Sequence, residues 1–409
     1  MTTKITFFLL FVFTLFCVTN VKALPSSEIT KDMVLNLSQN SSLNEKILRV
    51  ENGLSTQSIE SESPNSTFKL ADRMEFYKTP GVSVAVIDRG KIDWARGYGV
   101  REAGKDEPVN PGTLFQAASI SKPVTAMAVL KLVQSGKLNL DENVNQKLVS
   151  WKVPHSRFTE DRKVTLRNLL SHSANLTVDG FDGYALDEEV PTTLQILNGE
   201  KPANSDKIKV DGKLDREFRY SGGGYVVIQQ LLSDVTGKPF NIFMQETVLD
   251  KLGMTNSTYQ QPLPKSEIAL AAGHNDKGNM IEGAWHTYPE MAPAGLWTTP
   301  SDLARFAIEI QQSASGKANS FLNKDIVEEM LTPQVGGWGL GFELLEGKSA
   351  RFAHGGGNEG FQCLLVGYKN TGQGAVVMTN SNQGISLAIE IINSIGKEYG
   401  WSDRLQLPK

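Results

Sequence analysis

Alternating apolar residues in the first quarter of this chain constrain its fold most strongly. Val82, Val84 and Val86 are separated by other small or apolar residues, and a second strand-like run covers 92–100. Side chains of a β-strand point alternately to its two faces, so this spacing predicts two strands. The Asp-Arg-Gly segment at 88–90 is typical of a tight turn. The sequence therefore predicts an antiparallel hairpin.

A second predicted hairpin lies far along the chain, at 361–368 and 374–379. Its two runs flank an Asn-Thr-Gly turn at 370–372. An amphipathic helix is expected next, with an apolar face formed by Ile385, Ile389, Ile392 and Ile395. Strands near both ends of the chain, with helices between them, favour an antiparallel sheet that the two ends build together.

Helical stretches with recognisable ends separate the two hairpins. They cover 124–133, 225–235 and 300–310. Gly136 and Gly237 end the first two, and Thr299 caps the third. These patterns predict an α/β fold of the α+β type, in which helices flank an antiparallel sheet and a mostly helical subdomain accompanies it. Because no internal repeat is visible, a solenoid or propeller is disfavoured.

The first 23 residues are predicted to be a signal peptide. Lys4 precedes an apolar run over 5–18, and a Val-Lys-Ala pattern at 21–23 is typical of a cleavage site. The alternative is a retained membrane anchor, but spanning a bilayer takes about 20 apolar residues and the run is shorter. The mature protein is therefore expected to be secreted or periplasmic, with no stable membrane anchor.

Three further segments are predicted after the signal peptide. Residues 24–67 are rich in Ser, Asn and Glu, which predicts a flexible linker with at most one short helix around 43–50. Residues 68–402 carry the strand and helix patterns and are expected to form the folded domain. Residues 403–409 are interpreted as a tail.

Composition excludes several classes of partner. The formal net charge is −4 at pH 7, and no basic cluster suggests a nucleic-acid partner. The five histidines lack His-x-x-x-His spacing, so neither a metal nor another cofactor is expected. Once the signal peptide is removed, Cys363 has no second cysteine with which to form an internal disulfide. The sequence carries no indication of oligomeric state.

Ser119 and Lys122 are the first candidate catalytic residues. Their Ser-Ile-Ser-Lys run precedes the apolar helix expected over 124–133, and positions three apart share one helix face with Cβ atoms about 5–6 Å apart. A lysine whose pKa is lowered can take the proton of a serine hydroxyl and activate it as a nucleophile. The helix start also leaves the Ser119 N–H free to face a developing oxyanion. Taken alone, the pair is better explained as an ordinary helix cap and a solvated lysine of the first turn, because short motifs often recur by chance.

Two further motifs follow in the chain. Tyr220 precedes a Ser-Gly-Gly-Gly run that opens a predicted helix, and His354 precedes Gly355, Gly356 and Gly357 at the predicted start of a C-terminal strand. Alone, these would be a half-buried tyrosine and a turn.

In that order the three motifs resemble those of the serine β-lactamase and penicillin-binding-protein superfamily, which are Ser-x-x-Lys, Tyr-x-Asn, and Lys-Thr-Gly or His-x-Gly. The similarity covers about residues 69 to 400, including 164–172 and 294–304. It is most evident toward the class C β-lactamases, D,D-peptidases and related esterases, and it implies a β-lactamase-like fold.

The resemblance also implies the residue roles. Ser119 would attack a carbonyl carbon, and Lys122 and Tyr220 would share the general acid and base work. His354 would line the site opposite them, and the backbone N–H groups of Ser119 and Gly357, beside Gly356, would hold the oxyanion. Lys122 is expected to favour the phenolate form of Tyr220.

Two departures from the family pattern bear on the substrate. Gly222 stands where Tyr-x-Asn has an amide, and His354-Gly355 stands where Lys-Thr would meet the carboxylate of a β-lactam. We therefore expect an exported serine hydrolase acting through an acyl-enzyme on a small ester, amide or D-amino-acid peptide, with weak or incidental β-lactamase activity.

One alternative is a catalytically silent protein of the same fold that binds cell-wall peptides or acts as a scaffold. The intact Ser119, Lys122 and Tyr220 count against it. An α/β-hydrolase is disfavoured because the sequence has no Gly-x-Ser-x-Gly nucleophile elbow. The loop over 177–208 is expected to shape the specificity pocket.

Overall fold

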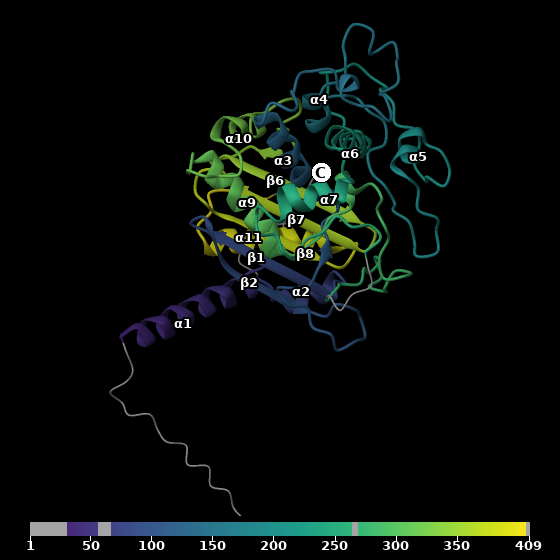
Figure 1. The fold of residues 1–409 in the computed structure, drawn as a ribbon. Helices are drawn as coiled ribbons and strands as arrows, with labels where there is room; N and C mark the ends of the chain where they lie inside the picture. Colours follow the sequence, from purple (N-terminus) through teal and green to yellow (C-terminus); the bar gives the residue numbers. More distant parts are fainter. Residues whose placement is uncertain (1–30, 56–66, 264–268, 406–409) are drawn as a thin grey trace, which may run out of the picture. The chain divides into compact units, whose positions relative to one another are not determined.

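A six-stranded antiparallel sheet, in the order β2-β1-β8-β7-β6-β5, forms the centre of the fold in a computed structural model that describes residues 31–55, 67–263 and 269–405 (Figure 1). Its strands are β1 (Gly81–Asp88), β2 (Lys91–Gly99), β5 (Glu343–Leu345), β6 (Arg351–Asn358), β7 (Phe361–Tyr368) and β8 (Gly374–Thr379). Both predicted hairpins are confirmed, as β1–β2 and β7–β8. The pairing of Val82 with Thr379 joins them, so the sheet is built from both ends of the chain as predicted.

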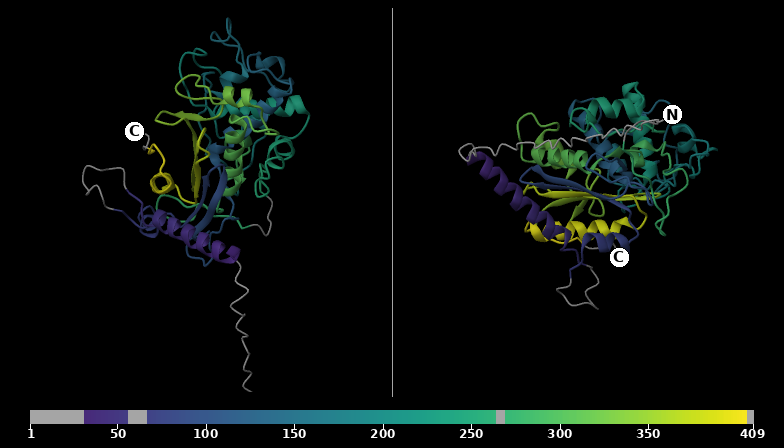
Figure 2. Two further views of the ribbon diagram at one scale, coloured as in Figure 1. Left: turned by 90° about the vertical axis from the view of Figure 1, so that its left-hand side faces the viewer. Right: turned by 90° about the horizontal axis from the view of Figure 1, so that it is seen from below.

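Helices cover both faces of this sheet. Figure 2 shows α9 (Pro300–Ala314) and α11 (Gly384–Glu398) on opposite faces, where α9 packs on β1 and β8 and α11 on β7 and β8. The predicted cap of α9 is confirmed, since the Thr299 side chain accepts a hydrogen bond from the N–H of Asp302. The isoleucine face predicted for α11 is confirmed for Ile389, Ile392 and Ile395, which are buried, whereas Ile385 is only partly buried.

The middle of the chain contains the longer helices α3 (Ser121–Gln134) and α6 (Gly222–Thr236), both largely buried. Around them lie short elements joined by long loops: α2 (Leu70–Phe76), α4 (Leu166–Leu170), α5 (Thr193–Asn198), α7 (Phe240–Met244), α8 (Met291–Ala294), α10 (Lys324–Met330), the 3₁₀ turns Ala118–Ile120 and Val144–Gln146, and a π turn at Gln245–Leu249. A two-residue pair, β3 (Phe115–Gln116) with β4 (Trp297–Thr298), leads into the first of these 3₁₀ turns.

The N-terminal segment differs from the predicted linker over 24–67. Helix α1 covers Lys31–Glu51 and is longer than the short helix expected around 43–50. The described residues divide into two separate units between 48 and 49, and within the second unit Val50 and Leu54 are buried. The Arg49 guanidinium lies 2.8 Å from the Glu398 carboxylate of α11. Apolar burial and this ion pair therefore hold 49–55 against the domain.

The C-terminal tail predicted for 403–409 also begins with packed residues. The Leu405 N–H donates to the Asn393 side chain at 2.9 Å, and the Asn393 amide donates back to the Leu405 carbonyl at 3.2 Å. The predicted signal peptide, 1–23, and residues 406–409 lie outside the described residues, so the segment boundaries at both ends stay predictions. Within the described ranges, no helix is long and apolar enough to cross a bilayer.

Candidate active site

Ser119 lies where the β3 strand turns into helix α3. The preceding Ala118 has a backbone φ of +47°, in the left-handed region that a residue with a Cβ rarely adopts. The turn is held on both sides, because the Ala117 N–H donates to the Leu296 carbonyl at 2.8 Å and the Cys363 thiol donates to the Ala117 carbonyl at 3.0 Å. The surrounding contacts therefore hold Ala118 in a strained conformation and fix the position of Ser119, the residue that follows it.

The predicted pairing of Ser119 with Lys122 is present. The Lys122 ammonium or amine Nζ lies 2.9 Å from the Ser119 Oγ and 3.2 Å from the Pro293 carbonyl oxygen. Lys122 is 2% exposed, and this burial lowers its pKa to about 7. At neutral pH a substantial fraction of the side chain is therefore an uncharged amine that can accept the Ser119 proton.

Tyr220 contacts the same Ser119 hydroxyl. Its phenol hydrogen-bonds with the Ser119 side chain, and its ring centroid lies 4.8 Å from Lys122 Nζ. Burial raises the Tyr220 pKa well above its usual value, with the Ser119 hydrogen bond opposing the shift. The expectation that Lys122 favours a phenolate is therefore wrong, because the cost of burying the phenolate is the larger effect. Tyr220 is present as a phenol and is suited to donate a proton.

His354, in strand β6, lies near the Tyr220 ring. Its ring centroid is 6.3 Å from that of Tyr220, and its Nδ1 lies 2.5 Å from the Gly355 carbonyl oxygen. Burial, together with the charge of Lys122, lowers the pKa of His354 to about 3. The imidazole is therefore neutral at physiological pH, as the sequence interpretation required. His354 lies within β6 and not at the start of the strand, because the glycines after it continue the β ladder with β7.

The glycines of β6 allow this strand to approach the serine turn closely. A Cβ on Gly356 would lie 2.4 Å from the Ala117 carbonyl oxygen and 3.1 Å from the Ser119 nitrogen, so no larger residue fits there. Gly357 follows as an exposed residue, opposite Gln362 of β7. The structure thus brings Ser119, Lys122, Tyr220, His354 and Gly356 together, and Gly357 lies directly beside them.

Trp338 is a site residue that the sequence reasoning missed. Its ring makes edge contacts with Tyr220 at 5.7 Å and with His354 at 5.2 Å, measured between centroids. It also stacks on Phe218 at 5.2 Å. Its place in a Gly-Gly-Trp-Gly run, residues 336–339, is a signal that could have found it, because such a run indicates a loop and loops carry many binding residues.

His172 was interpreted from the sequence as a positioning or packing residue, and its contacts are of that kind. Its ring lies 4.4 Å from the Tyr220 ring, tilted by 31°, and its Nδ1 accepts a hydrogen bond from the Ser221 N–H at 3.1 Å. Burial, followed by the charge of Lys122, lowers the pKa of His172 well below its usual value. A neutral ring therefore supports the Tyr220 ring from behind.

One cavity of about 430 Å³ contains the exposed parts of Ser119, Tyr220 and His354. It is lined by Ser119, Tyr220, Trp338, Glu343, Leu345, Ala353, His354, Gly355, Gly356, Gly357, Gln362, Leu364, Ile385, Ile389 and Leu405. Among the described residues, no group of three or more His, Cys, Asp or Glu side chains is arranged to hold a metal ion.

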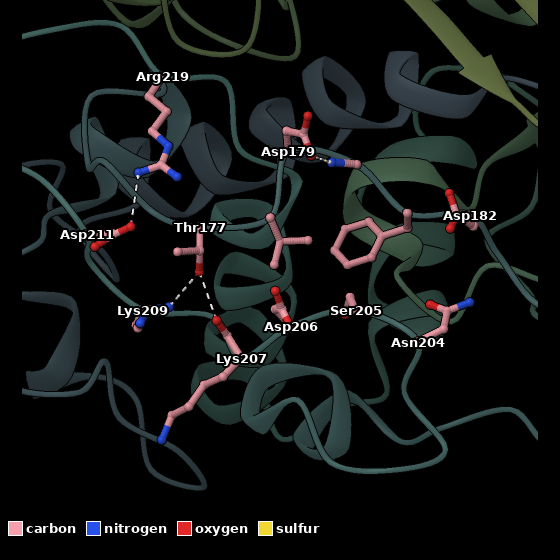
Figure 3. Close-up of a pocket in the computed structure, with 13 residues that line it drawn as sticks. Thr177, Asp179, Asp182, Asn204, Ser205, Asp206, Lys207, Lys209, Asp211 and Arg219 are labelled. Carbon is pink, nitrogen blue, oxygen red and sulfur yellow. Dashed lines mark hydrogen bonds and ion pairs between the residues drawn. The ribbon is translucent and has the colours of Figure 1, made fainter.

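The loop over 177–208 lines a second cavity of about 680 Å³, which does not include Ser119 (Figure 3). Its walls are charged and polar, and the Arg219 guanidinium lies 3.8 Å from the Asp211 carboxylate. Phe181 of this loop meets the start of α6, where a Cβ on Gly222 would lie 2.9 Å from the phenyl ring. The loop therefore fills the space that an amide side chain at 222 would need.

The chain belongs to the Beta-lactamase family, whose model matches residues 69–394. Members of this family are typically serine hydrolases.

Individual relatives are more distant. Protein flp of Staphylococcus aureus (strain N315) is 24% identical over 316 residues, which is 74% of this chain but 60% of the length of that relative. The D-amino acid amidase of Ochrobactrum anthropi SV3, solved with L-phenylalanine amide, has a TM-score of 0.67 at 19% identity and covers 87% of this chain and 99% of its own. A class C β-lactamase has a TM-score of 0.65 at 21% identity, covering 80% of this chain and 93% of its own. At these identities the two structures establish the fold.

Proposed function

We propose that this chain is an exported serine hydrolase that forms an acyl-enzyme on Ser119 and acts on a small ester, amide or D-amino-acid peptide. The single observation that carries the proposal is the 2.9 Å contact between Lys122 Nζ and Ser119 Oγ, made by a lysine whose burial lowers its pKa to about 7. An activated serine of this kind is required for nucleophilic catalysis and serves no purpose in simple binding.

The reaction begins with proton transfer from Ser119 to the neutral amine of Lys122. As the Ser119 Oγ bonds to the carbonyl carbon, the carbonyl oxygen gains negative charge, which the N–H groups of Ser119 and Gly357 stabilise. The Tyr220 phenol gives its proton to the departing oxygen or nitrogen, and the Lys122 ammonium restores that proton. The acyl group then remains on Ser119 and the leaving group departs as a neutral alcohol or amine.

Deacylation uses the same residues in the opposite direction. Water donates a proton to Lys122 as its oxygen attacks the acyl carbon, and Ser119 Oγ recovers a proton as the carboxylic acid product departs. Because Lys122 and Tyr220 both reach Ser119 Oγ, each step has a base and an acid within reach.

Two features support an ester or amide in place of a β-lactam. His354 is uncharged at physiological pH, so it offers no cation to the carboxylate that a β-lactam carries. Phe181 occupies the space beside Gly222 where the family's asparagine would reach an acyl side chain. The amidase relative was solved with L-phenylalanine amide, and an amino-acid amide of that size is a suitable first substrate to test.

The test is to incubate the purified protein with a fluorophosphonate probe and with short-chain nitrophenyl esters, then to locate the label by mass spectrometry. We expect a single label on Ser119, ester turnover faster than nitrocefin turnover, and neither activity in Ser119→Ala. Ser135→Ala, at the far end of α3, is the matched control. Absence of label and turnover in the folded protein would favour the silent binding protein.

A further inference from the structure

We propose that the part of the Ser119 cavity on the α11 side of strand β6 binds an apolar, uncharged leaving group of the substrate. This inference rests on the proposed function, because a leaving group exists only if Ser119 is acylated. It adds what that function leaves open, namely which chemical class of alcohol or amine the substrate carries. Four observations support it.

The first observation is that strand β6 carries no side chains at two positions that line the cavity. Gly355 and Gly357 alternate with buried residues along the strand, and they lie opposite Leu364 and Gln362 of β7. A Cβ added to Gly355 would find its nearest neighbour, the Cys363 carbonyl oxygen, at 3.9 Å. The backbone at Gly355 therefore borders open space.

The second observation is the apolar wall around that space. Ile385 and Ile389 of α11 and Leu345 of β5 line it, together with Leu364 and Leu405. Leu405 is held in place by its two backbone hydrogen bonds to the Asn393 side chain. An apolar cavity of about 150 Å³ is enough to bind benzene. The 430 Å³ of the whole cavity therefore leaves room for a ring or a medium alkyl chain beside the reacting carbonyl.

The third observation gives the direction in which the substrate lies. The leaving atom must face Tyr220, because in the proposed mechanism that phenol, which hydrogen-bonds with Ser119, gives the leaving atom its proton. The rings of Tyr220, Trp338 and His354 contact one another, and all three residues line the same cavity as Gly355. A group leaving toward Tyr220 therefore extends along β6 to the apolar wall.

The fourth observation is the charge along this path. Glu343 lines the cavity at its β5 end, and Ala353 pairs with it across the strands. His354 is neutral, and the ammonium of Lys122 lies at the Ser119 end, beside Ser119 Oγ. A leaving group with a carboxylate would meet Glu343, and none of the described residues that line the cavity is a lysine or an arginine. The charges thus favour an uncharged group over an anionic one.

The experiment measures acetate release from a series of alkyl acetates, from methyl through hexyl, and compares kcat/KM across the series. In the unsubstituted protein we expect kcat/KM to rise at least tenfold from methyl to hexyl acetate. In Gly355→Leu, the new side chain projects into the cavity, so the ratio of kcat/KM for hexyl acetate to kcat/KM for methyl acetate should drop to within about twofold of one. In Gly355→Ala, this ratio should lie between those of Gly355→Leu and the unsubstituted protein. Gly180→Leu, at another open glycine that lies in the second cavity, is the matched control and should keep the ratio.

Charge preference is tested with hexyl acetate and its carboxylate analogue, 6-acetoxyhexanoate. We expect the neutral ester to be preferred by more than tenfold and Glu343→Lys to narrow that preference. A series of nitrophenyl esters with acyl groups of two to six carbons keeps the leaving group constant and tests the acyl side of the site. The proposal would be overturned if Gly355→Leu removed a dependence of kcat/KM on the length of the acyl group and not on the length of the alcohol. It would also be overturned if kcat/KM depended on neither length.

The two proposals fail in distinguishable ways. If the fluorophosphonate does not label Ser119 in folded protein, the hydrolase function fails and the leaving-group site falls with it. If Ser119 is labelled and methyl acetate is turned over, but chain length and Gly355→Leu have no effect on the ratio, only the leaving-group site is wrong.

Discussion

The two cavities of this protein differ in what builds them. The Ser119 cavity is lined mainly by strands β5, β6 and β7 and helix α11, whereas the second cavity is lined by loop residues with charged side chains (Figure 3). In the first, burial shifts the pKa values of Lys122 and His354. In the second, Arg219 and Asp211 are both more than two-fifths exposed. The shifted pKa values thus lie among regular, buried elements, and we expect the proposed chemistry to depend on the first cavity more than on the second.

Loss of the nucleophile is expected to have the largest effect. Ser119→Ala should lower kcat by more than about 1,000-fold, because the acyl-enzyme can no longer form. Arg219→Ala in the second cavity should change kcat less than about threefold. Both are measured by nitrophenyl ester turnover, with circular dichroism to establish folding. A large loss in Arg219→Ala would break the distinction between the two cavities.

The pH profile of acylation tests the buried base. With the Lys122 pKa lowered to about 7, the amine is protonated and inactive at low pH, so the acylation rate should rise with pH and reach a plateau above about 7. At pH 5 the rate should be about 100-fold below the plateau, since the neutral fraction falls tenfold per pH unit.

Lys122→Met is expected to lower the acylation rate by about 100-fold or more and to remove this pH dependence. Lys131→Met, on the same helix but with its Nζ at the Phe321 carbonyl, is the matched control and should keep the profile. A profile that is flat from pH 5 to 8 in the unsubstituted protein would contradict Lys122 as the base.

Glu290 tests whether burial also controls stability next to the site. It precedes α8, is fully buried, and its pKa is raised to about 8 by desolvation. A carboxyl whose pKa rises on folding binds its proton more tightly in the folded state, so stability falls as pH rises from about 4.5 toward 8.

Glu290→Gln removes this loss while keeping the side-chain volume. In urea denaturation the variant should be more stable than the unsubstituted protein at pH 8, by on the order of 3 kcal/mol, and similar to it at pH 4.5. An equal difference at both pH values would show that ionisation of Glu290 is not the cause.

The smallest effect is expected from the ion pair in the loop cavity. The 3.8 Å contact between Arg219 and Asp211 is solvent-exposed, so Asp211→Asn should change the free energy of unfolding by less than about 1 kcal/mol. Urea denaturation at low and high salt measures it. A cost of several kcal/mol would show that the second cavity is more rigid than the comparison assumes.

The sequence predicted the parts of this molecule that depend on local spacing. The two hairpins and the contact of Ser119 with Lys122 follow from strand alternation and from residues three apart at a helix start. The Tyr220 ionisation was predicted wrongly, because the cost of burial depends on the whole surroundings and not on one neighbouring charge.

The remaining parts depend on tertiary packing. Trp338, Ile385 and Leu405 reach the Ser119 cavity from separate elements, and only the folded chain brings them together. Likewise, the packing of 49–55 depends on a few apolar residues and on a partner, Glu398, almost 350 positions away. The segment was predicted to be a linker from its composition, because an average over many polar residues does not reveal a few residues that make specific contacts.

The Cys363 thiol also provides a way to time motion in the site. It lies between the Ala117 carbonyl at 3.0 Å and the Gly356 carbonyl at 3.6 Å, and it is completely buried. Because the sulfur is buried, an alkylating reagent reaches it only when the surrounding structure opens, so the alkylation rate measures how often that opening occurs. The measurement needs no substrate, and comparing the rate before and after reaction at Ser119 would show whether modification of the serine slows the opening.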